Sequence, residues 1–344
     1  MPLNRRTFLT AAAGASTVFA APAIVMAAGP KEKLTVAVGS EHALVYLPWD
    51  VAKAMGYFDA EGLDVNLIYT KGGTEAGLAL LSGNVDYSGN AIDHAIAAAQ
   101  QGKSLVMISD FMDQPGLTLI TKPENKSKYS SGAALKGKTI GITSVGSATD
   151  VLAHWIGHRN GLSRDDIKTV GVGGGATVMA ALLGNQVDVA FANDPYATLL
   201  MRQGRAIPIA EMYTAHVTRD WLGFNSYTFT GALTRADVIA KYPERTQKIV
   251  NALTRAMKFM AVSSAQKLSG SLNDEFRGGA SLDDWAAAYA HSRPAYGPFG
   301  RISPDGVKAV IETNEFFLGK KSTADPAKLY DNSFVEKAVK TVKV

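Results

Sequence analysis

The feature that most limits the fold of this chain is a strand–turn–helix unit that recurs along its N-terminal part. Short apolar stretches typical of buried strands lie at residues 34–38, 63–69, 85–89 and 105–111. Stretches with helical periodicity lie between them, at residues 43–55, 76–81 and 91–101. Glycines such as Gly72 and Gly83 mark the joints. Strands and helices that alternate at this spacing predict a mostly parallel sheet with helices on both faces.

The same unit returns after a strand at residues 117–121 and a polar surface loop at residues 122–132. We expect further strands at residues 138–142, 167–172 and 187–191, and helices at residues 150–160, 176–183 and up to Gln203. A chain of 344 residues exceeds what one hydrophobic core usually serves. The sequence therefore predicts an α/β fold with two lobes, each a mostly parallel sheet flanked by helices.

The remainder of the chain is β-rich at residues 227–233 and helical at residues 235–241, 244–264, 281–291 and 303–318. This tail contains too little strand for a third sheet, so we expect it to pack back on the first lobe. The chain then crosses between the lobes twice, near Leu119 and Tyr227, and two crossings form a hinge that lets lobes close over a ligand. The predicted domains are residues 29–119 plus 228–344 for the first lobe and 120–227 for the second.

The first 28 residues have the pattern of an export signal. Arg5 and Arg6 precede Phe8-Leu9 and an alanine-rich apolar stretch that closes with small residues. This pattern resembles a twin-arginine signal peptide, and we expect cleavage near Ala27 or Ala28 and a periplasmic mature protein. A membrane anchor is the weaker alternative, because polar residues, glycine and proline dilute a stretch that would need about 20 apolar residues.

Composition excludes several classes of function. The chain has no cysteine, so it has no disulfide framework and no thiolate nucleophile. Its formal net charge is +4, and removing Arg5 and Arg6 leaves +2 without a basic run, which argues against nucleic acid as a partner. The six histidines lack the spacing of a metal site. We therefore expect no metal and no cofactor.

A series of short motifs then follows in a fixed order along the chain. It runs through Gly56-Tyr57-Phe58, Gly62-Leu63, Gly72-Gly73, Ser82-Gly83, Val85-Asp86, Leu135-Lys136-Gly137-Lys138, Val187-Asp188 and Asp194-Pro195-Tyr196. In this order the chain resembles the solute-binding proteins of ABC transporters in the sulfonate, nitrate and thiamine-precursor group, most loosely after about residue 265. The resemblance implies a periplasmic binding protein fold of type II. It also implies that the protein captures a small molecule between its lobes, as a monomer, and delivers it to a membrane permease.

Ligands of such folds bind beyond the carboxyl ends of the strands, so residues at predicted strand exits are the candidates for ligand binding. They are Ser40, Glu41, His42, Tyr46, Gly73, Thr74, Asn90, Ser144, Ser147, Thr149, Asn193, Asp194, Tyr196 and Tyr227. Several stand at helix starts, where free N–H groups favour an anionic group, and the tyrosines can stack on a flat ligand. Thr74, Asn90 and Asn193 can instead be simple helix caps. Two cationic residues are not at strand exits themselves. Lys71 is close to a strand exit, and Arg293 could reach the cleft from the tail.

These residues favour an organic sulfonate or carboxylate as the ligand of an ABC importer. The alternative ligand is a pyrimidine of the thiamine-precursor type or another aromatic heterocycle. An alternative of another class is a protein that presents its ligand to a membrane sensor. An enzyme is not expected, because the chain lacks the cysteine-rich motif of the pyrimidine-synthesising branch, a Gly-x-Ser-x-Gly motif and a phosphate loop.

Overall fold

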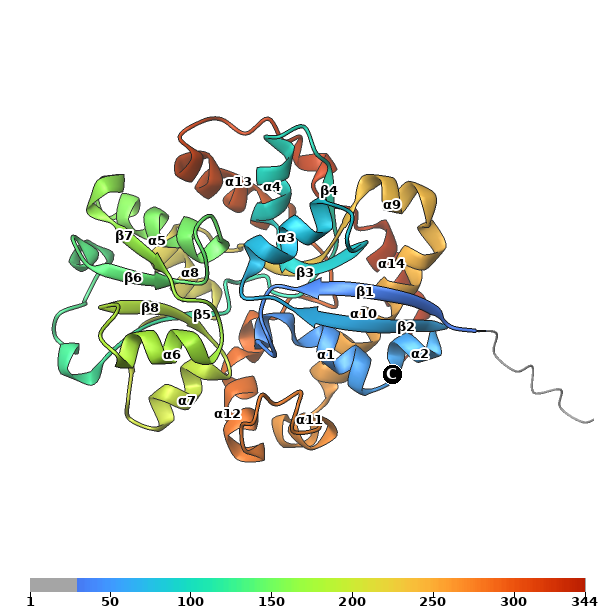
Figure 1. The fold of residues 1–344 in the computed structure, drawn as a ribbon, viewed down its shortest axis with the longest axis horizontal. Coiled ribbons are helices and arrows are strands. Elements are labelled where there is room, and N and C mark those ends of the chain that lie inside the picture. The colour runs from blue at the N-terminus through green and yellow to red at the C-terminus, as the bar shows by residue number, and fades with distance from the viewer. Residues whose placement is uncertain (1–29, 344) are drawn as a thin grey trace, which may run out of the picture.

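The computed structural model describes residues 30–343, whose strands form two five-stranded sheets (Figure 1). The first sheet has the order β2-β1-β3-β10-β4, with β1 Glu32–Val38, β2 Leu63–Tyr69, β3 Tyr87–Ala91, β4 Leu105–Asp110 and β10 Thr230–Arg235. The second has the order β7-β6-β8-β5-β9, with β5 Leu117–Thr121, β6 Thr139–Ile142, β7 Lys168–Gly171, β8 Val189–Asn193 and β9 Ile207–Met212. The predicted signal peptide lies outside the described residues.

Both sheets have the same pairing pattern. In the first, β1 runs parallel to β2 and β3, and β10 runs antiparallel to β3 and β4. In the second, β6 runs parallel to β7 and β8, and β5 runs antiparallel to β8 and β9. The fourth strand of each sheet is therefore the one that follows a chain crossing. The predicted α/β fold with two mostly parallel, helix-flanked sheets is confirmed.

The helices cover the faces of the two sheets (Figure 1). The helices that follow the strands of the first sheet are α1 Leu47–Ala54, α2 Tyr57–Ala60, α3 Gly73–Leu81 and α4 Asp93–Ala99. Those of the second sheet are α5 Ala148–Arg159, α6 Ala176–Leu183, α7 Tyr196–Arg202 and α8 Ala215–Leu222. The tail adds α9 Ala236–Lys241, α10 Pro243–Val262, α11 Ala265–Ser271, α12 Leu282–Ser292, α13 Pro304–Leu318 and α14 Ser333–Thr341. The sequence patterns did not predict β9, α2, α8, α11 and α14.

Local sequence explains where the long helix α13 begins and ends. The Ser303 hydroxyl accepts a hydrogen bond from the backbone N–H of Gly306, and Pro304 occupies the first helical position. The helix ends at Gly319, whose φ of 66° is the left-handed conformation that glycine adopts without steric cost. These two signals fix the length of the helix.

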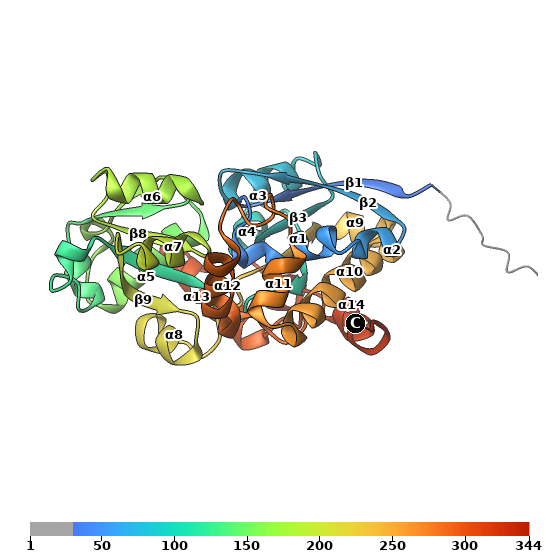
Figure 2. The same cartoon turned by 90° about the horizontal axis from the view of Figure 1, so that it is seen from below.

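The tail packs on both lobes. Helix α10 packs on α1 and α2, and a segment before α14 extends the edge of the first sheet through a hydrogen bond of 2.8 Å from the N–H of Met107 to the carbonyl of Leu329. Two other tail helices contact the second lobe: His291 of α12 binds Asp194, and Arg164 binds the carbonyl of Phe317 at the end of α13. In the view from below, α12 and α13 lie near the boundary of the lobes (Figure 2). We expected the tail to pack back on the first lobe, and α12 and α13 contact the second lobe as well.

The bounds of the two lobes, residues 29–119 plus 228–344 and residues 120–227, stay a prediction. Between residues 30 and 343, no helix combines the length and the hydropathy that a membrane span requires. Within the same range, no three His, Asp or Glu side chains come together in a way that could hold a metal ion.

Candidate functional site: a polar pocket between the lobes

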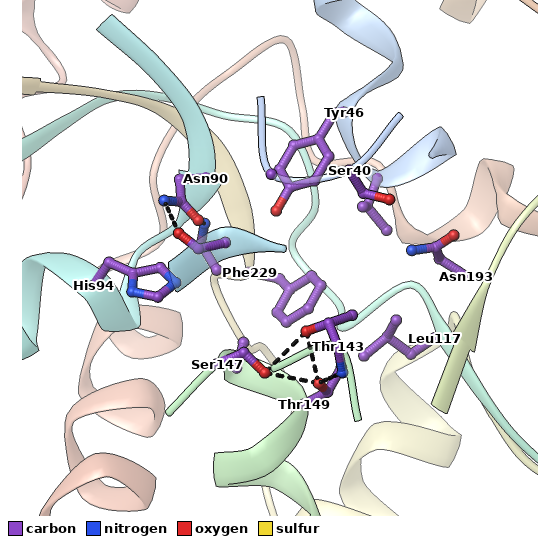
Figure 3. A pocket seen from close by; sticks show the side chains of 15 residues that line it. Ser40, Tyr46, Asn90, His94, Leu117, Thr143, Ser147, Thr149, Asn193 and Phe229 are labelled. Atoms are coloured by element: carbon purple, nitrogen blue, oxygen red, sulfur yellow. Dashed lines mark hydrogen bonds between the residues drawn. The ribbon is translucent and has the colours of Figure 1, made fainter. Parts of the chain in front are cut away.

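A narrow pocket lies between the two lobes, where the predicted strand exits meet. Its cavity volume is about 30 Å³. The polar side chains that line it are those of Ser40, Tyr46, Asn90, His94, Thr143, Ser147, Thr149 and Asn193 (Figure 3). The first four come from the first lobe and the last four from the second. Leu117 and Phe229, at the chain crossings, add apolar surface.

Three hydroxyl groups of the second lobe form a closed cluster at the start of α5. The hydroxyl of Thr143 lies 2.9 Å from that of Ser147 and 3.0 Å from that of Thr149, and the last two are 2.9 Å apart (Figure 3). The backbone N–H of Thr143 also donates to Thr149, at 2.9 Å. The cluster is thus oriented before any ligand arrives. Because α5 begins at Ala148, the cluster lies at the positive end of the helix dipole.

The first lobe contributes an amide and an imidazole that pack against Gly73. The Asn90 Nδ2 donates to the carbonyl of Gly73 at 2.9 Å, and its Oδ1 accepts from the N–H of Ala91 at 2.9 Å. A Cβ on residue 73 would lie 2.6 Å from Asn90 Oδ1 and 2.7 Å from His94 Nε2. Only glycine fits there without a shift of these side chains.

Two buried polar atoms in this pocket have no hydrogen-bond partner within residues 30–343. They are Nε2 of His94, a residue 9% exposed, and Oδ1 of Asn193, a residue 6% exposed. Buried polar atoms are usually paired, and one without a partner in the protein calls for a water or a ligand. These two atoms come from opposite lobes, so a ligand that binds both also links the lobes.

The surroundings of the pocket combine the positive end of the α5 dipole with a buried acid of the first lobe, Asp93. Among the described residues that line it, none is Lys or Arg. Asp93 is buried beside Tyr46, and burial, together with the charge of Asp93, raises the pKa of Tyr46. Burial raises the pKa of Asp93 as well. A ligand that carries a full negative charge therefore meets no compensating side-chain cation in this pocket.

The narrow pocket opens into a wide outer cleft of about 1080 Å³. Ser40 and Thr143 line both spaces. Lys71 and Glu41 bring opposite charges to the wall of the outer cleft, and Tyr196 brings an aromatic ring. A ligand larger than the narrow pocket has continuous space into which it can extend.

The lobes touch at one rim of the outer cleft. The Thr74 hydroxyl lies 3.0 Å from the Ser144 hydroxyl, and the N–H of Gly174 donates to the carbonyl of Lys71 at 3.3 Å. A Cβ on Gly174 would lie 2.6 Å from the hydroxyl oxygen of Ser40. We refer to Lys71–Thr74, Ser144 and Gly174 as the rim contact.

The structure brings most of the predicted ligand residues together. Seven of them line the narrow pocket: Ser40, Tyr46, Gly73, Asn90, Ser147, Thr149 and Asn193. Three line the outer cleft: Glu41, Ser144 and Tyr196. Thr74 lies at the rim contact, and His42, Asp194 and Tyr227 bind other side chains. The ligand-binding role of all these residues stays a prediction.

His42 packs inside the first lobe. Its Nδ1 lies 3.3 Å from the buried Asp50 carboxylate, which also accepts the hydroxyl of Tyr69 at 2.6 Å. Burial acts to lower the pKa of His42, but the hydrogen bond and charge of Asp50 outweigh it and raise this pKa. The ring of His42 lies between those of Tyr69 and Phe276, with centroids 4.6 Å and 5.7 Å away. These contacts account for its position without a ligand.

Asp194 and Tyr227 bind residues of the tail. The Asp194 carboxylate accepts hydrogen bonds of 2.8 Å each from His291 and Ser292 of α12. The other ring nitrogen of His291 lies 2.8 Å from Glu211. Tyr227 is fully buried, and its hydroxyl lies 2.9 Å from that of Thr313.

All three capping alternatives are wrong. Asn193 is the last residue of β8, and the N-cap of α7 is Pro195. Asn90 lies inside β3, and α4 begins three residues later, at Asp93. Thr74 lies in the first turn of α3, whose N-cap is Gly72. Sequence reasoning also missed His94 and Thr143. His94 was predicted in the helix after Asn90, and its position four residues after a strand-exit residue, in the first turn of that helix, was the available signal.

The 4-amino-5-hydroxymethyl-2-methylpyrimidine phosphate synthase of Candida albicans (strain WO-1) is 26% identical over 233 residues, which span 66% of this chain and 67% of the relative. A solved structure from Bordetella bronchiseptica RB50 has a TM-score of 0.83 and 26% identity, and the match covers 90% of this chain and 98% of that one.

Two further solved structures share the fold at lower identity. The alkanesulfonate-binding protein SsuA of Xanthomonas axonopodis pv. citri, bound to MOPS, has a TM-score of 0.67 and 20% identity over 90% of this chain and 99% of its own. The periplasmic nitrate-binding protein NrtA of Synechocystis PCC 6803 has a TM-score of 0.72 and 12% identity over 91% and 90%. These likenesses support the two-lobe periplasmic binding protein fold.

The comparison corrects one prediction. The sequence led us to expect that the chain is not an enzyme, yet the Candida relative carries the name of an enzyme, as do relatives in Saccharomyces cerevisiae at 21% identity. The expectation rested on the lack of a cysteine-rich motif and of nucleophile and phosphate-loop motifs. Such local patterns do not detect chemistry carried out by side chains that only the fold brings together.

The fold and the order of the motifs agree with a match to a single family model. That model, described as NMT1/THI5 like, matches residues 40–265, which is more than half of the chain and includes every residue that lines the narrow pocket except Gly39. The chain belongs to the NMT1/THI5-like family.

Proposed function

We propose that this protein is the extracytoplasmic solute-binding component of an ABC importer. The observation that supports this most is the narrow pocket, in which side chains of both lobes face one small space that opens into a wide cleft. In this proposal a ligand enters the open cleft and the lobes close over it through the crossings at β5 and β10. The closed protein, in the periplasm, then delivers the ligand to a permease of the inner membrane.

The ligand that the lining of the pocket favours is a neutral nitrogen heterocycle of the pyrimidine type. Its ring is larger than the cavity of about 30 Å³, so in this proposal the lobes stand further apart when the ring is bound. An aminopyrimidine accepts hydrogen bonds at its ring nitrogens and donates them from its amino group, which suits the unpaired His94 Nε2 and Asn193 Oδ1. Its lack of charge suits a lining without Lys or Arg beside the buried Asp93. The name of the Candida relative, a synthase of a pyrimidine phosphate, is consistent with this chemistry.

An organic sulfonate or carboxylate is the second candidate. The hydroxyl cluster of Thr143, Ser147 and Thr149 at the N-terminus of α5 favours it, because hydroxyl and backbone donors at a helix N-terminus stabilise anions. The fold shared with an alkanesulfonate-binding protein is consistent with it. The two candidates differ in the groups that bind them: His94 and Asn193, from opposite lobes, for the pyrimidine, and the hydroxyl cluster of the second lobe for the anion.

Isothermal titration calorimetry tests the proposal by measuring the affinity of the purified protein for aminopyrimidines, alkyl sulfonates and carboxylates. If a pyrimidine binds, His94→Leu is expected to weaken binding about tenfold or more, and Ser147→Ala less. If a sulfonate binds, this order reverses. Asn90→Ala and Tyr196→Ala are expected to weaken either ligand, and His216→Ala, an exposed histidine of α8, is the matched control. If a ligand binds with the same affinity to all of these variants and to the wild type, its site lies outside this pocket.

A further inference from the structure

We propose that the protein has a second small-molecule site, outside the cleft, that takes an aromatic monocarboxylate the size of benzoate. The site is a separate cavity between α10, α12 and the segment that follows α12. Its volume is about 130 Å³, and its walls include Met257, Met260, Tyr289, Tyr296 and Phe299. None of these residues lines the narrow pocket or the outer cleft.

The size and lining of this cavity fit one aromatic ring. An apolar cavity of about 150 Å³ in another protein holds a benzene molecule. Two methionines and three aromatic side chains provide adaptable apolar contacts and ring edges for such a ligand. The ring of a benzoate therefore has both the space and the surface that it requires.

Arg293 provides the charge at the polar end of the cavity. The sequence suggested that this arginine reaches the cleft, but the structure places it in the wall of the second cavity, on the turn after α12. One of its terminal N–H groups donates to the carbonyl of Ala261 at 2.7 Å, in the last turn of α10. That bond caps the helix and uses one of five guanidinium donors.

The remaining donors of Arg293 have no carboxylate partner. Arg202, Arg235 and Arg245 each form an ion pair with an aspartate, whereas Arg293 forms none within residues 30–343. A planar guanidinium that presents free N–H groups beside an apolar cavity matches the two oxygens of a carboxylate. The geometry thus combines a ring-sized space with a carboxylate-binding head.

Two acidic side chains lie behind Gly297, which lines the cavity: a Cβ there would lie 3.5 Å from the Cβ of Asp113 and 3.6 Å from Oδ2 of Asp110, whose side chain is completely buried. Burial raises the pKa of Asp113, against the hydrogen bond from Ser226. Burial, and then the charge of Asp113, raise the pKa of Asp110 well above its usual range, which favours its uncharged form.

The backbone beside the cavity is held in a conformation that fits a binding role. Phe299 has a φ of 55°, in the left-handed region that residues other than glycine rarely adopt, and its ring lines the cavity mouth. Backbone strain of this kind persists where the surrounding structure fixes it, often at ligand sites.

NMR spectra of methyl-labelled methionine test the site, because Met257 and Met260 line the second cavity and no methionine of residues 30–343 lines the narrow pocket or the outer cleft. Titration with benzoate is expected to shift the Met257 and Met260 methyl signals, assigned with Met257→Leu and Met260→Leu, and not that of Met201. Benzamide and phenol, which lack the negative charge, are expected to bind at least about tenfold more weakly.

Three variants separate the parts of the proposal. Arg293→Gln is expected to weaken benzoate binding about tenfold, while Arg301→Gln, an exposed arginine of the same segment that does not line the cavity, leaves it unchanged. Ala261→Phe fills the exposed mouth from α10 and is expected to abolish the shifts while Arg293 remains. The proposal is wrong if the two methyl signals do not move with about 20 mM benzoate, if benzamide binds as tightly as benzoate, or if Ala261→Phe changes nothing. Because these signals do not report on the cleft, failure here is separate from failure of the importer proposal.

Discussion

The two lobes have the same strand order but not the same protection. In the first lobe every residue of the edge strand β4 is buried, and the tail segment around Leu329 covers its free edge. In the second lobe only two of the six residues of the corresponding edge strand β9 are buried, Ala210 and Met212, and the opposite edge strand, β7, is mostly exposed. The two lobes thus share one topology, but the first has an extra helical layer and the second has more accessible edge strands.

The difference shows that the tail, rather than the sheet, decides how each lobe is stabilised. Helices α10 and α14 pack on the first lobe, whereas α12 and α13 pack on α7 and α5 of the second lobe, where His291 binds Asp194 and Arg164 binds the carbonyl of Phe317. A separate cluster of ten buried residues, among them Ile120, Val178 and Leu200, packs α6 and α7 against the second sheet. We therefore expect comparable substitutions to lower the free energy of unfolding more in the first lobe than in the second.

The largest effect is expected from glycines inside the two sheets. A Cβ on Gly231 of β10 would lie 2.1 Å from the backbone oxygen of Ser109, while one on Gly141 of β6 would lie 3.1 Å from the Cβ of Ala190. Gly231→Ala must therefore move a strand, and we expect it to lower the free energy of unfolding by about 3 kcal/mol, against about 1 kcal/mol for Gly141→Ala. Urea denaturation followed by tryptophan fluorescence measures both. Equal losses would remove the proposed difference between the lobes.

The next effect concerns the contact between α12 and the second lobe, and it depends on pH. Burial acts to lower the pKa of His291, but its hydrogen bonds to Asp194 and Glu211 raise it from 6.5 to about 9. A raised pKa contributes stability that is complete below pH 6.5 and is lost as the pH rises through 9.

His291→Gln is therefore expected to destabilise the protein by about 2 kcal/mol at low pH and by much less once the pH exceeds the raised pKa. Thermal unfolding of both proteins across this pH range measures the difference. His216→Gln, an exposed histidine of α8, is the control. A difference between wild type and His291→Gln that does not change with pH would contradict the assigned charge of His291.

A smaller effect is expected where the lobes approach each other. In Gly174→Ala the new methyl group would lie 2.6 Å from the Ser40 hydroxyl oxygen, so the lobes cannot close fully. We expect ligand affinity to fall about tenfold with little change in melting temperature. Gly171→Ala is the matched control, because its Cβ would meet ordinary contacts at 3.5 Å. If small-angle scattering shows the same ligand-induced compaction in Gly174→Ala and wild type, the rim contact does not limit closure.

The smallest effect is expected from the hydroxyl pair at the same rim. Thr74→Val removes the contact with Ser144 but leaves the shape nearly unchanged. We expect a loss of about 0.5 kcal/mol in binding, seen as faster ligand dissociation in stopped-flow fluorescence. Thr341→Val, on α14, is the control. A loss as large as that of Gly174→Ala would show that the hydroxyl contact, and not the close approach of the backbone, holds the rim.

Much of the fold could be predicted because each strand carries its own signals. The strands at residues 63–69 and 117–121 and the helix at residues 176–183 were predicted with their observed bounds, since apolar periodicity and flanking glycines mark both ends. β9 was missed because Pro208 and Glu211 interrupt its apolar pattern. Its pairing with β5 is a long-range contact that local sequence does not encode.

The candidate site could be predicted only in part, for a similar reason. Strand exits point to the right edge of each sheet, which explains why Asn90, Ser147 and Asn193 meet in one pocket. The exits do not reveal which side chains turn inward. His42 pairs with Asp50 and Asp194 with His291, and both partners come from other elements. His94 faces the pocket because Gly73 leaves room for its ring, and no local sequence pattern predicts that contact.

The place of β10 in its sheet also has a consequence for the order in which the chain matures during synthesis. β4 joins the first sheet only through β10, which lies about 120 residues later in the chain. All five strands of the second sheet lie between β4 and β10, so that lobe can complete its sheet while the first still lacks two pairings. On the ribosome, the lobe that begins second is the one that can finish first. The sheet of the first lobe stays incomplete between β3 and β4 until β10 has been synthesised.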